Sequence, residues 1–321
     1  MIPPIASRFV AGESPPEALE HVQQLNDDGV GAILNLLGEH HDDPDVVADD
    51  TDAYCSLVES IAMSGFDVCI SVKPSQIGLD IGPEAFESNL ERIVSHAAER
   101  DVFVWVDMEN HTTTDATLEA YERLAREYAS VETAESMESA ELEVVETVEG
   151  GTGSEGVALE DDVALENRAA VEGAVGLCLQ ANLKRTREDL ERLNDVPGKV
   201  RLVKGAYDEP KSIAYKDKDR VDKAYRTLLE DAFQNRDGGI AVGSHDPAMI
   251  AYARELHEEY GTPYEVQMLM GVREDAQREL AAEGVTVYQY VPYGSRWLLY
   301  FYRRVRERKE NLLFAARAIL S

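Results

Sequence analysis

The sequence predicts an α/β fold, a distorted (β/α)8 barrel of the TIM type, from three observations. Eight short apolar runs recur along the chain, amphipathic stretches lie between them, and 321 residues is an ordinary length for one barrel domain. The expected strands span residues 31–38, 66–73, 102–107, 174–180, 200–205, 240–245, 264–269 and 285–290. The expected helices include residues 83–100, 117–129, 186–193, 222–234, 247–260 and 273–283.

An open doubly wound sheet is the main alternative architecture. Such a sheet usually has fewer strands and a glycine-rich turn after the first one, whereas here the first strand runs into Leu37-Gly-Glu39. The pattern G-x-G-x-x-G occurs at residues 151–156, but no strand precedes it and the surrounding carboxylates would repel a pyrophosphate. We therefore reject a dinucleotide site there and favour the barrel.

The chain is expected to form a single domain over residues 1–321 with one acidic insertion. From residue 131 to residue 166 the sequence has twelve acidic residues, no Lys or Arg and a glycine-rich centre. Segments with little apolar content and a high net charge bury too little surface to fold alone. We expect residues 131–166 to be a flexible excursion on the helical side of the barrel.

The charge balance excludes some classes of partner. The chain has 31 basic and 62 acidic residues, a net charge of −31, which disfavours nucleic acid and anionic lipid as partners. It favours a strongly hydrated surface and a halophilic source, with an ordinary acidic protein as the alternative. Three scattered cysteines favour reduced core thiols over a disulfide framework or a metal site. Without an apolar run of about 18 residues or a signal peptide, a cytoplasmic protein with no integral membrane segment is expected.

Polar side chains stand at the expected carboxyl ends of all eight strands, where barrel enzymes build their active sites. They are Glu39, Lys73, Asp107, Gln180, Lys204 with Tyr207, His245, Gln267 and Tyr290. No nucleophile elbow and no H-E-x-x-H pattern accompanies them, which disfavours hydrolysis. Lys73 and Lys204 are candidates for Schiff-base lysines, so a lysine-dependent aldolase stays open; they could equally be ion-paired, with Asp107 as an available partner.

The segment after the last strand carries two adjacent arginines, Arg303 and Arg304. Tyr300 lies three residues before the pair and Glu307 three residues after it, so these side chains share helical faces. Two guanidinium groups facing a pocket are suited to binding a substrate carboxylate. A basic C-terminal helix on the surface is an equally good interpretation of the spacing alone.

The sequence resembles the proline dehydrogenase family. The resemblance begins with Tyr290-Val-Pro-Tyr-Gly294, Trp297 and Tyr300-Phe-Tyr-Arg-Arg304, and further motifs occur in the family's order and cover most of the chain outside the insertion. They are Arg8-Phe-Val-Ala-Gly12, Leu36-Leu-Gly-Glu39, Lys73-Pro-Ser-Gln-Ile-Gly78, Leu179-Gln-Ala-Asn-Leu-Lys-Arg-Thr186, Val200-Arg-Leu-Val-Lys-Gly-Ala-Tyr207, Ser244-His245 and Glu265-Val-Gln-Met-Leu269. Asn182 departs from the family, in which an aromatic residue is common at that position.

The resemblance implies FAD-dependent oxidation of L-proline to Δ1-pyrroline-5-carboxylate, with hydride transfer from proline C5 to flavin N5. It implies FAD contacts from Gln180, Arg201, Val203, Lys204, Gly205, His245, Gln267 and Glu307. It implies a substrate site in which Arg303, Arg304 and Lys73 bind the carboxylate, Leu202, Tyr207, Tyr290 and Tyr300 pack the ring, and Asp107 orients the polar groups. The C-terminal helix would lie over the strand ends.

The resemblance also implies a quinone as electron acceptor, which would bring the protein to the inner face of a membrane, and it leaves a homo-oligomer open. Three alternatives remain at this point. They are a flavin barrel of the methylenetetrahydrofolate reductase type, the lysine-dependent aldolase, and a barrel that binds proline or FAD as a sensor without chemistry.

Overall fold

The structure is a computed structural model that describes residues 2–3, 6–129, 173–236, 238–298 and 300–302. The acidic insertion at residues 131–166 lies outside these ranges, as do Arg303, Arg304 and Glu307.

Eight parallel strands form a closed barrel in sequence order, β1 to β8, with β8 pairing back onto β1. This confirms the predicted fold class. The strands are β1 (Gly31–Leu36), β2 (Val68–Val72), β3 (Val104–Val106), β4 (Val175–Gln180), β5 (Val200–Val203), β6 (Ile240–Gly243), β7 (Tyr264–Leu269) and β8 (Val287–Tyr293).

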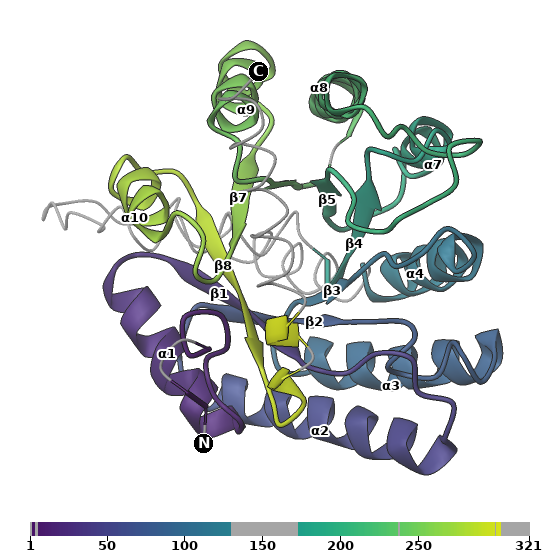
Figure 1. Ribbon diagram of the computed structural model, residues 1–321, viewed down its shortest axis with the longest axis vertical. Helices are drawn as coiled ribbons and strands as arrows, with labels where there is room; N and C mark the ends of the chain where they lie inside the picture. Colours follow the sequence, from purple (N-terminus) through teal and green to yellow (C-terminus); the bar gives the residue numbers. More distant parts are fainter. Residues whose placement is uncertain (1, 4–5, 130–172, 237, 299, 303–321) are drawn as a thin grey trace, which may run out of the picture.

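Helices surround the barrel, with α2 and α3 on one side and α8 and α9 on the opposite side (Figure 1). They are α1 (Pro15–Asp27), α2 (Pro44–Ala62), α3 (Pro83–Ala98), α4 (Thr114–Tyr128), α7 (Thr186–Arg192), α8 (Lys218–Asn235), α9 (Pro247–Tyr260) and α10 (Glu274–Ala282). Several begin with a proline in the first turn, where its missing N–H costs nothing. Asp43, Asp217 and Asp246 cap α2, α8 and α9 by accepting a backbone N–H.

Alternation along the strands separates two cores. Ile33, Cys69, Trp105, Ala241 and Tyr288 pack together in one cluster inside the barrel. The intervening strand residues join the apolar faces of the helices in a second, much larger cluster between the two layers. The inward layer nearest the carboxyl ends is polar, and it holds the candidate site. Cys55, Cys69 and Cys178 are free and buried, as expected.

β8 continues three residues beyond its expected end, to Tyr293. All six residues of β1 are in register with it, from Gly31 opposite Tyr288 to Leu36 opposite Tyr293. Pro292, within this extension, has no N–H to donate to the ladder. The Pro292 carbonyl instead accepts from the backbone N–H of Ala11, so the N-terminal segment packs along this part of the strand.

The helices in the described ranges include none with the length and apolar character needed to span a bilayer.

Candidate active site

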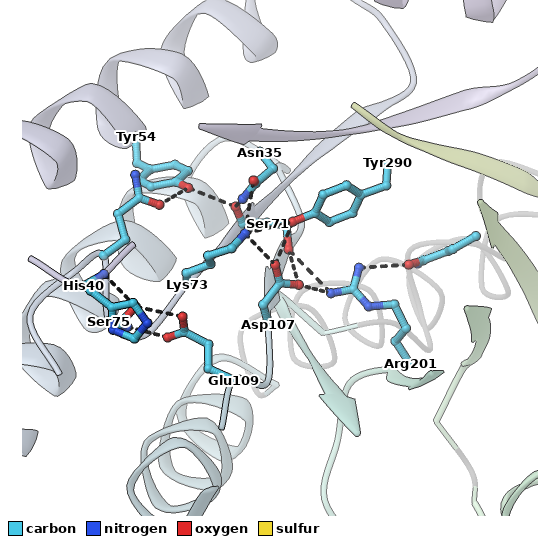
Figure 2. A network of polar contacts seen from close by, with 12 residues as sticks. Asn35, His40, Tyr54, Ser71, Lys73, Ser75, Asp107, Glu109, Arg201 and Tyr290 are labelled. Carbon is cyan, nitrogen blue, oxygen red and sulfur yellow. Dashed lines mark hydrogen bonds and ion pairs between the residues drawn. The ribbon is translucent and has the colours of Figure 1, made fainter. Parts of the chain in front are cut away.

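Four charged or phenolic side chains meet inside the barrel near the carboxyl ends of the strands. Lys73 and Asp107 directly follow β2 and β3, Arg201 lies in β5 and Tyr290 in β8. Figure 2 shows them pointing toward one another. Residues two apart on a strand share a face, so the inward positions of four strands supply one polar centre.

Asp107 is the hub of this centre. Its Oδ1 accepts from Arg201 Nη2 and from Ser71 Oγ, the latter at 2.8 Å. Its Oδ2 accepts from the Tyr290 hydroxyl at 2.7 Å and lies 3.5 Å from Lys73 Nζ. The carboxylate therefore has four donors, two of them cationic, which is how a charge is retained away from water.

The electrostatics favour an ionised Asp107 and neutral Tyr290. Burial opposes charge on Asp107, but Arg201 and Lys73 outweigh it, and the pKa of the carboxyl is lowered. Burial and the neighbouring Asp107 charge raise the pKa of the Tyr290 phenol well above its ordinary value. Burial also works against the Arg201 charge, yet nearby acidic groups including Asp107 raise its pKa. The centre thus presents fixed charges and one phenol donor.

Three residues of this centre were missed from the sequence. Asn35 Oδ1 accepts from Lys73 Nζ at 3.2 Å, and its amide donates to the Ser71 carbonyl at 3.0 Å. The Tyr54 hydroxyl from α2 donates to the same carbonyl at 3.0 Å. Asn35 and Ser71 are isolated polar residues at inward positions of apolar strands, two residues from Ile33 and Lys73. That periodicity was available in the sequence.

A second ion pair supports Arg201 from deeper in the barrel. Arg201 Nη1 donates to Gln267 Oε1 at 3.0 Å, Gln267 donates to Glu265, and Glu265 accepts from Lys199 at 2.7 Å. The Arg201 guanidinium also lies 4.8 Å from the Trp105 ring centroid. With 4% of its surface exposed, Arg201 is fixed in place by these contacts.

The cofactor candidates lie beside this centre on β4 to β7. Gln180 is buried and donates to the Glu109 carbonyl at 2.7 Å, while Val203 is half-buried at the end of β5. Lys204 Nζ forms ion pairs with Asp222 Oδ1 at 2.6 Å and Asp246 Oδ2 at 2.8 Å. His245 Nε2 accepts the backbone N–H of Leu269 at 3.4 Å, which joins the ends of β6 and β7.

Gly205 and Asn182 form a narrow recess next to Lys204. Gly205 has φ of +104°, and a Cβ at this position would lie 2.1 Å from Asn182 Oδ1. That oxygen is buried and has no hydrogen-bond partner among the described residues. The recess suits a large polar cofactor. The glycine lets the cofactor approach the backbone closely, the Asn182 oxygen can accept from a donor group, and the nearby cations suit phosphates.

Two of the expected substrate residues lie on the rim. Tyr207 is half-buried in the loop after β5, where buried Glu209 accepts from the backbone N–H of His111 at 2.8 Å and also contacts its ring. Tyr300 packs against Phe9 and Val10 and against Leu37 beyond the end of β1. The described part of the C-terminal segment thus lies at the carboxyl ends of the strands.

Leu202 of β5 packs toward the helices. It has no exposed surface and belongs to the cluster between the barrel and the helices. Its neighbours Arg201 and Val203 take the inward positions, so Leu202 faces outward by the period of two along a strand. The packing of Leu202 against the substrate ring stays a prediction.

Glu109 is a buried acid that the sequence interpretation also missed. It is fully buried, and its two oxygens accept from the Ser75 backbone N–H at 2.6 Å and the Ser75 hydroxyl at 2.7 Å. Burial outweighs these bonds and raises the pKa of Glu109. The pair ties the loop after β2 to the loop after β3, immediately beyond Lys73 and Asp107.

The chain forms a closed (β/α)8 barrel, and charged side chains joined by hydrogen bonds lie at the carboxyl ends of its strands. These features define the class of protein as a barrel enzyme. Known proteins identify the family. The family model described as proline dehydrogenase matches residues 18–317. The chain belongs to the proline dehydrogenase family.

Relatives and solved structures agree with this assignment. The chain is 34% identical to proline dehydrogenase of Deinococcus radiodurans, over 98% of this chain and 90% of that protein. It is 31% identical to proline dehydrogenase 1 of Bacillus subtilis (strain 168), over 98% and 90%. The structure superposes on proline utilization A from Bdellovibrio bacteriovorus inactivated by N-propargylglycine with a TM-score of 0.75 and 22% identity. That match covers 94% of this chain and 32% of the other, so this chain spans about a third of that protein's length and shares its barrel fold.

Proposed function

We propose that this chain oxidises L-proline to Δ1-pyrroline-5-carboxylate with FAD as its cofactor. The single observation that carries the proposal is the Lys73–Asp107–Arg201–Tyr290 centre at the strand ends of a proline dehydrogenase barrel. It offers fixed cations and a phenol but no activated nucleophile. Such a set suits a reaction in which the protein positions two reactants and excludes water.

FAD, when bound, would accept the hydride from proline C5 at N5. Gln180, Arg201, Val203, Lys204, Gly205, His245 and Gln267 are the described residues proposed to hold it, together with Glu307 outside the described ranges. The support is the recess at Gly205, the unpartnered Asn182 oxygen and the cations beside them. Lys204 is already bonded to two carboxylates, so its charge toward the cofactor is partly balanced.

Substrate binding is proposed to use the carboxylate and the ring of proline separately. Lys73 would bind the carboxylate together with Arg303 and Arg304, because cations in a half-buried site form strong charge-assisted hydrogen bonds. Tyr207, Tyr290 and Tyr300 would pack the ring. Asp107 would act as a positioning residue, since it holds Lys73, Arg201 and Tyr290 in one arrangement.

The ion pair of Lys73 disfavours the aldolase alternative. A Schiff-base lysine must be neutral to attack a carbonyl, and enzymes lower its pKa by burial or a neighbouring cation. Lys73 instead forms an ion pair with Asp107 at 3.5 Å, so its neighbour at this distance is an anion and not a cation of that kind. Lys204 lies between two carboxylates. Membership of the proline dehydrogenase family also stands against the methylenetetrahydrofolate reductase type.

The remaining expectations are part of the proposal. Residues 1–321 would form one barrel domain carrying the insertion at residues 131–166. The electrons would pass to a quinone, with the protein cytoplasmic and meeting the inner face of a membrane peripherally. A net charge of −31 would be repelled by anionic headgroups at low salt, so quinone reduction in anionic vesicles should increase as ionic strength rises.

Arg303→Met and Arg304→Met test the proposal together with the control Arg308→Met. The first two should raise the KM for proline by roughly tenfold to a hundredfold and leave the protein yellow with FAD, because each removes one charge-assisted contact. Arg308→Met should leave both unchanged. A protein that cannot be loaded with FAD contradicts the cofactor assignment, and FAD-loaded protein that forms no Δ1-pyrroline-5-carboxylate favours the sensor alternative.

A further inference from the structure

A cationic pocket lies between α7 and α8, on the helical side of the barrel. Ten residues line a cavity of about 320 Å³, and its charged members are Lys184, Arg187, Arg220 and Lys223. No Asp or Glu is among its lining residues in the part of the chain that the structure describes. Acidic residues outnumber basic ones by 62 to 31 in this chain, so four cations around one cavity run against its composition.

Two of these cations lack a counter-ion among the described residues. Arg220 and Lys223 form no ion pair within the described ranges, and they stand three residues apart near the start of α8, on one helical face. Asp222, between them in sequence, is bonded to Lys204 and Lys218 instead. Adjacent unpaired cations repel one another, and an anion between them would remove that cost.

The other two cations close the opposite wall. Lys184 donates to the carbonyls of Lys211 and Ser212 at 3.2 and 2.8 Å. Arg187 lies 3.2 Å from Glu191 and 3.4 Å from Asp231, so its charge is shared. Arg220 and Lys223 are therefore the two lining cations best placed to bind an anion.

Arg220 is held in position before any ligand arrives. Its guanidinium carbon lies 4.8 Å from the centroid of the Tyr215 ring. The backbone of Tyr215 donates to the Asn182 carbonyl at 2.8 Å, which fixes this ring relative to the loop after β4. A stacked guanidinium loses little freedom when it binds an anion, so the contact is favourable for recognition.

The floor of the pocket is apolar. Leu183 and Leu228 are almost fully buried there, and Ala181 and Ala224 complete it. The volume lies at the lower end of small-ligand sites, roughly 300–1,000 Å³, and a bare phosphate would fill only part of it. We propose that the pocket binds a small organic phosphate, with the phosphate on Arg220 and Lys223 and the organic part in the remaining volume above the apolar floor.

The test uses FAD-loaded protein, adenosine monophosphate as the probe and calorimetric titration. Wild type should give a saturable isotherm without loss of the flavin colour. Arg220→Gln and Lys223→Gln should each weaken the affinity by about tenfold or more. Arg226→Gln is the matched control, because Arg226 lies on the same helix but against Tyr252 of α9, and it should change the affinity by less than about twofold.

Three results would overturn the inference. They are the absence of saturable binding, an equal loss in all three variants, and displacement of FAD by the nucleotide, which would place the probe in the cofactor site. Inorganic pyrophosphate is the second probe, and it should bind more weakly than the nucleotide because it fills less of the pocket. Tighter binding of pyrophosphate would contradict the organic part of the assignment. None of these readouts needs proline oxidation, so their failure is separable from failure of the proposed function.

Discussion

Tyr290 donates its hydroxyl proton to Asp107 Oδ2 over 2.7 Å, and this bond connects the last strand of the barrel to the third. Lys73 Nζ lies 3.5 Å from both groups, so the phenol, the carboxylate and the ammonium position one another.

Tyr290→Phe should lower kcat/KM for proline by roughly tenfold to a hundredfold, because a hydrogen bond to a charged group is lost at the site. Tyr288→Phe is the matched control. Tyr288 lies on the same strand, and its hydroxyl donates to Asp67 at 2.9 Å, at the amino end of the barrel. Its removal should leave kcat/KM nearly unchanged. Equal losses in steady-state kinetics of the two variants would contradict the placement of the site.

Lys73→Met and Lys204→Met should separate substrate binding from cofactor binding. Lys73→Met should raise the KM for proline by about tenfold or more and leave FAD affinity unchanged, because Lys73 faces the Asp107 centre. Lys204→Met should weaken FAD binding, because Lys204 is a proposed cofactor contact, and it should change the KM of the loaded enzyme little, because Lys204 is paired with Asp222 and Asp246 rather than with the Asp107 centre. Flavin titration and steady-state kinetics measure the two effects. A loss of FAD affinity in Lys73→Met together with a raised KM in Lys204→Met would contradict both assignments.

Gly205→Ala should destabilise the protein and weaken FAD binding more than Gly261→Ala does. Both glycines have positive φ, +104° and +74°, so each alanine costs roughly 1 kcal/mol of backbone strain. The new Cβ at Gly205 would also lie 2.1 Å from Asn182 Oδ1, whereas a Cβ added at Gly261 would have no neighbouring atom within 4 Å. Adding Asn182→Ala should restore part of the loss at Gly205. Thermal unfolding that shifts equally in both single variants would argue against the collision.

Asp107→Asn should lower the free energy of unfolding near neutral pH by about 3–5 kcal/mol, because it leaves Arg201 and Lys73 without their counter-ion. The folded pKa of Asp107 is below its unfolded value, so this contribution is present above roughly pH 4 and is lost as pH falls through the folded pKa. The difference between wild type and variant in urea unfolding should therefore shrink in acid.

Asp115→Asn is the control for this pH dependence. Its pKa is lowered by the hydrogen bond to Arg185, but both side chains are substantially exposed, so solvent screens the pair. The variant should differ little from wild type at any pH. A wild-type advantage over Asp107→Asn that grows as pH falls would contradict the ionised state of Asp107.

The sequence predicted the barrel because eight short apolar runs alternate with amphipathic stretches outside residues 131–166. It also predicted that Lys73, Asp107 and Tyr290 would meet, since the carboxyl ends of parallel strands converge. The length of β8 was missed, since its last three residues, Pro292 among them, are in the strand through their pairing with β1. The pairing of β1 with β8 joins residues far apart in the chain, so local sequence patterns do not reveal it.

The partners of the site residues were the least predictable part. Arg201 was expected at the cofactor, and the structure bonds it to Asp107 and Gln267, whose positions depend on the radius and register of the closed barrel. Leu202 packs in the cluster between barrel and helices, and its assignment to the substrate stays a prediction. Glu109 and Ser75 lie in loops beyond the strands, where no period relates one residue to another.

Anaerobic addition of L-proline to the FAD-loaded protein tests the central claim most directly. The visible flavin band should bleach with saturable dependence on proline, one Δ1-pyrroline-5-carboxylate should form for each flavin reduced, and Tyr290→Phe should slow the bleaching while Tyr288→Phe does not. A flavin band that stays oxidised in saturating proline would contradict the account.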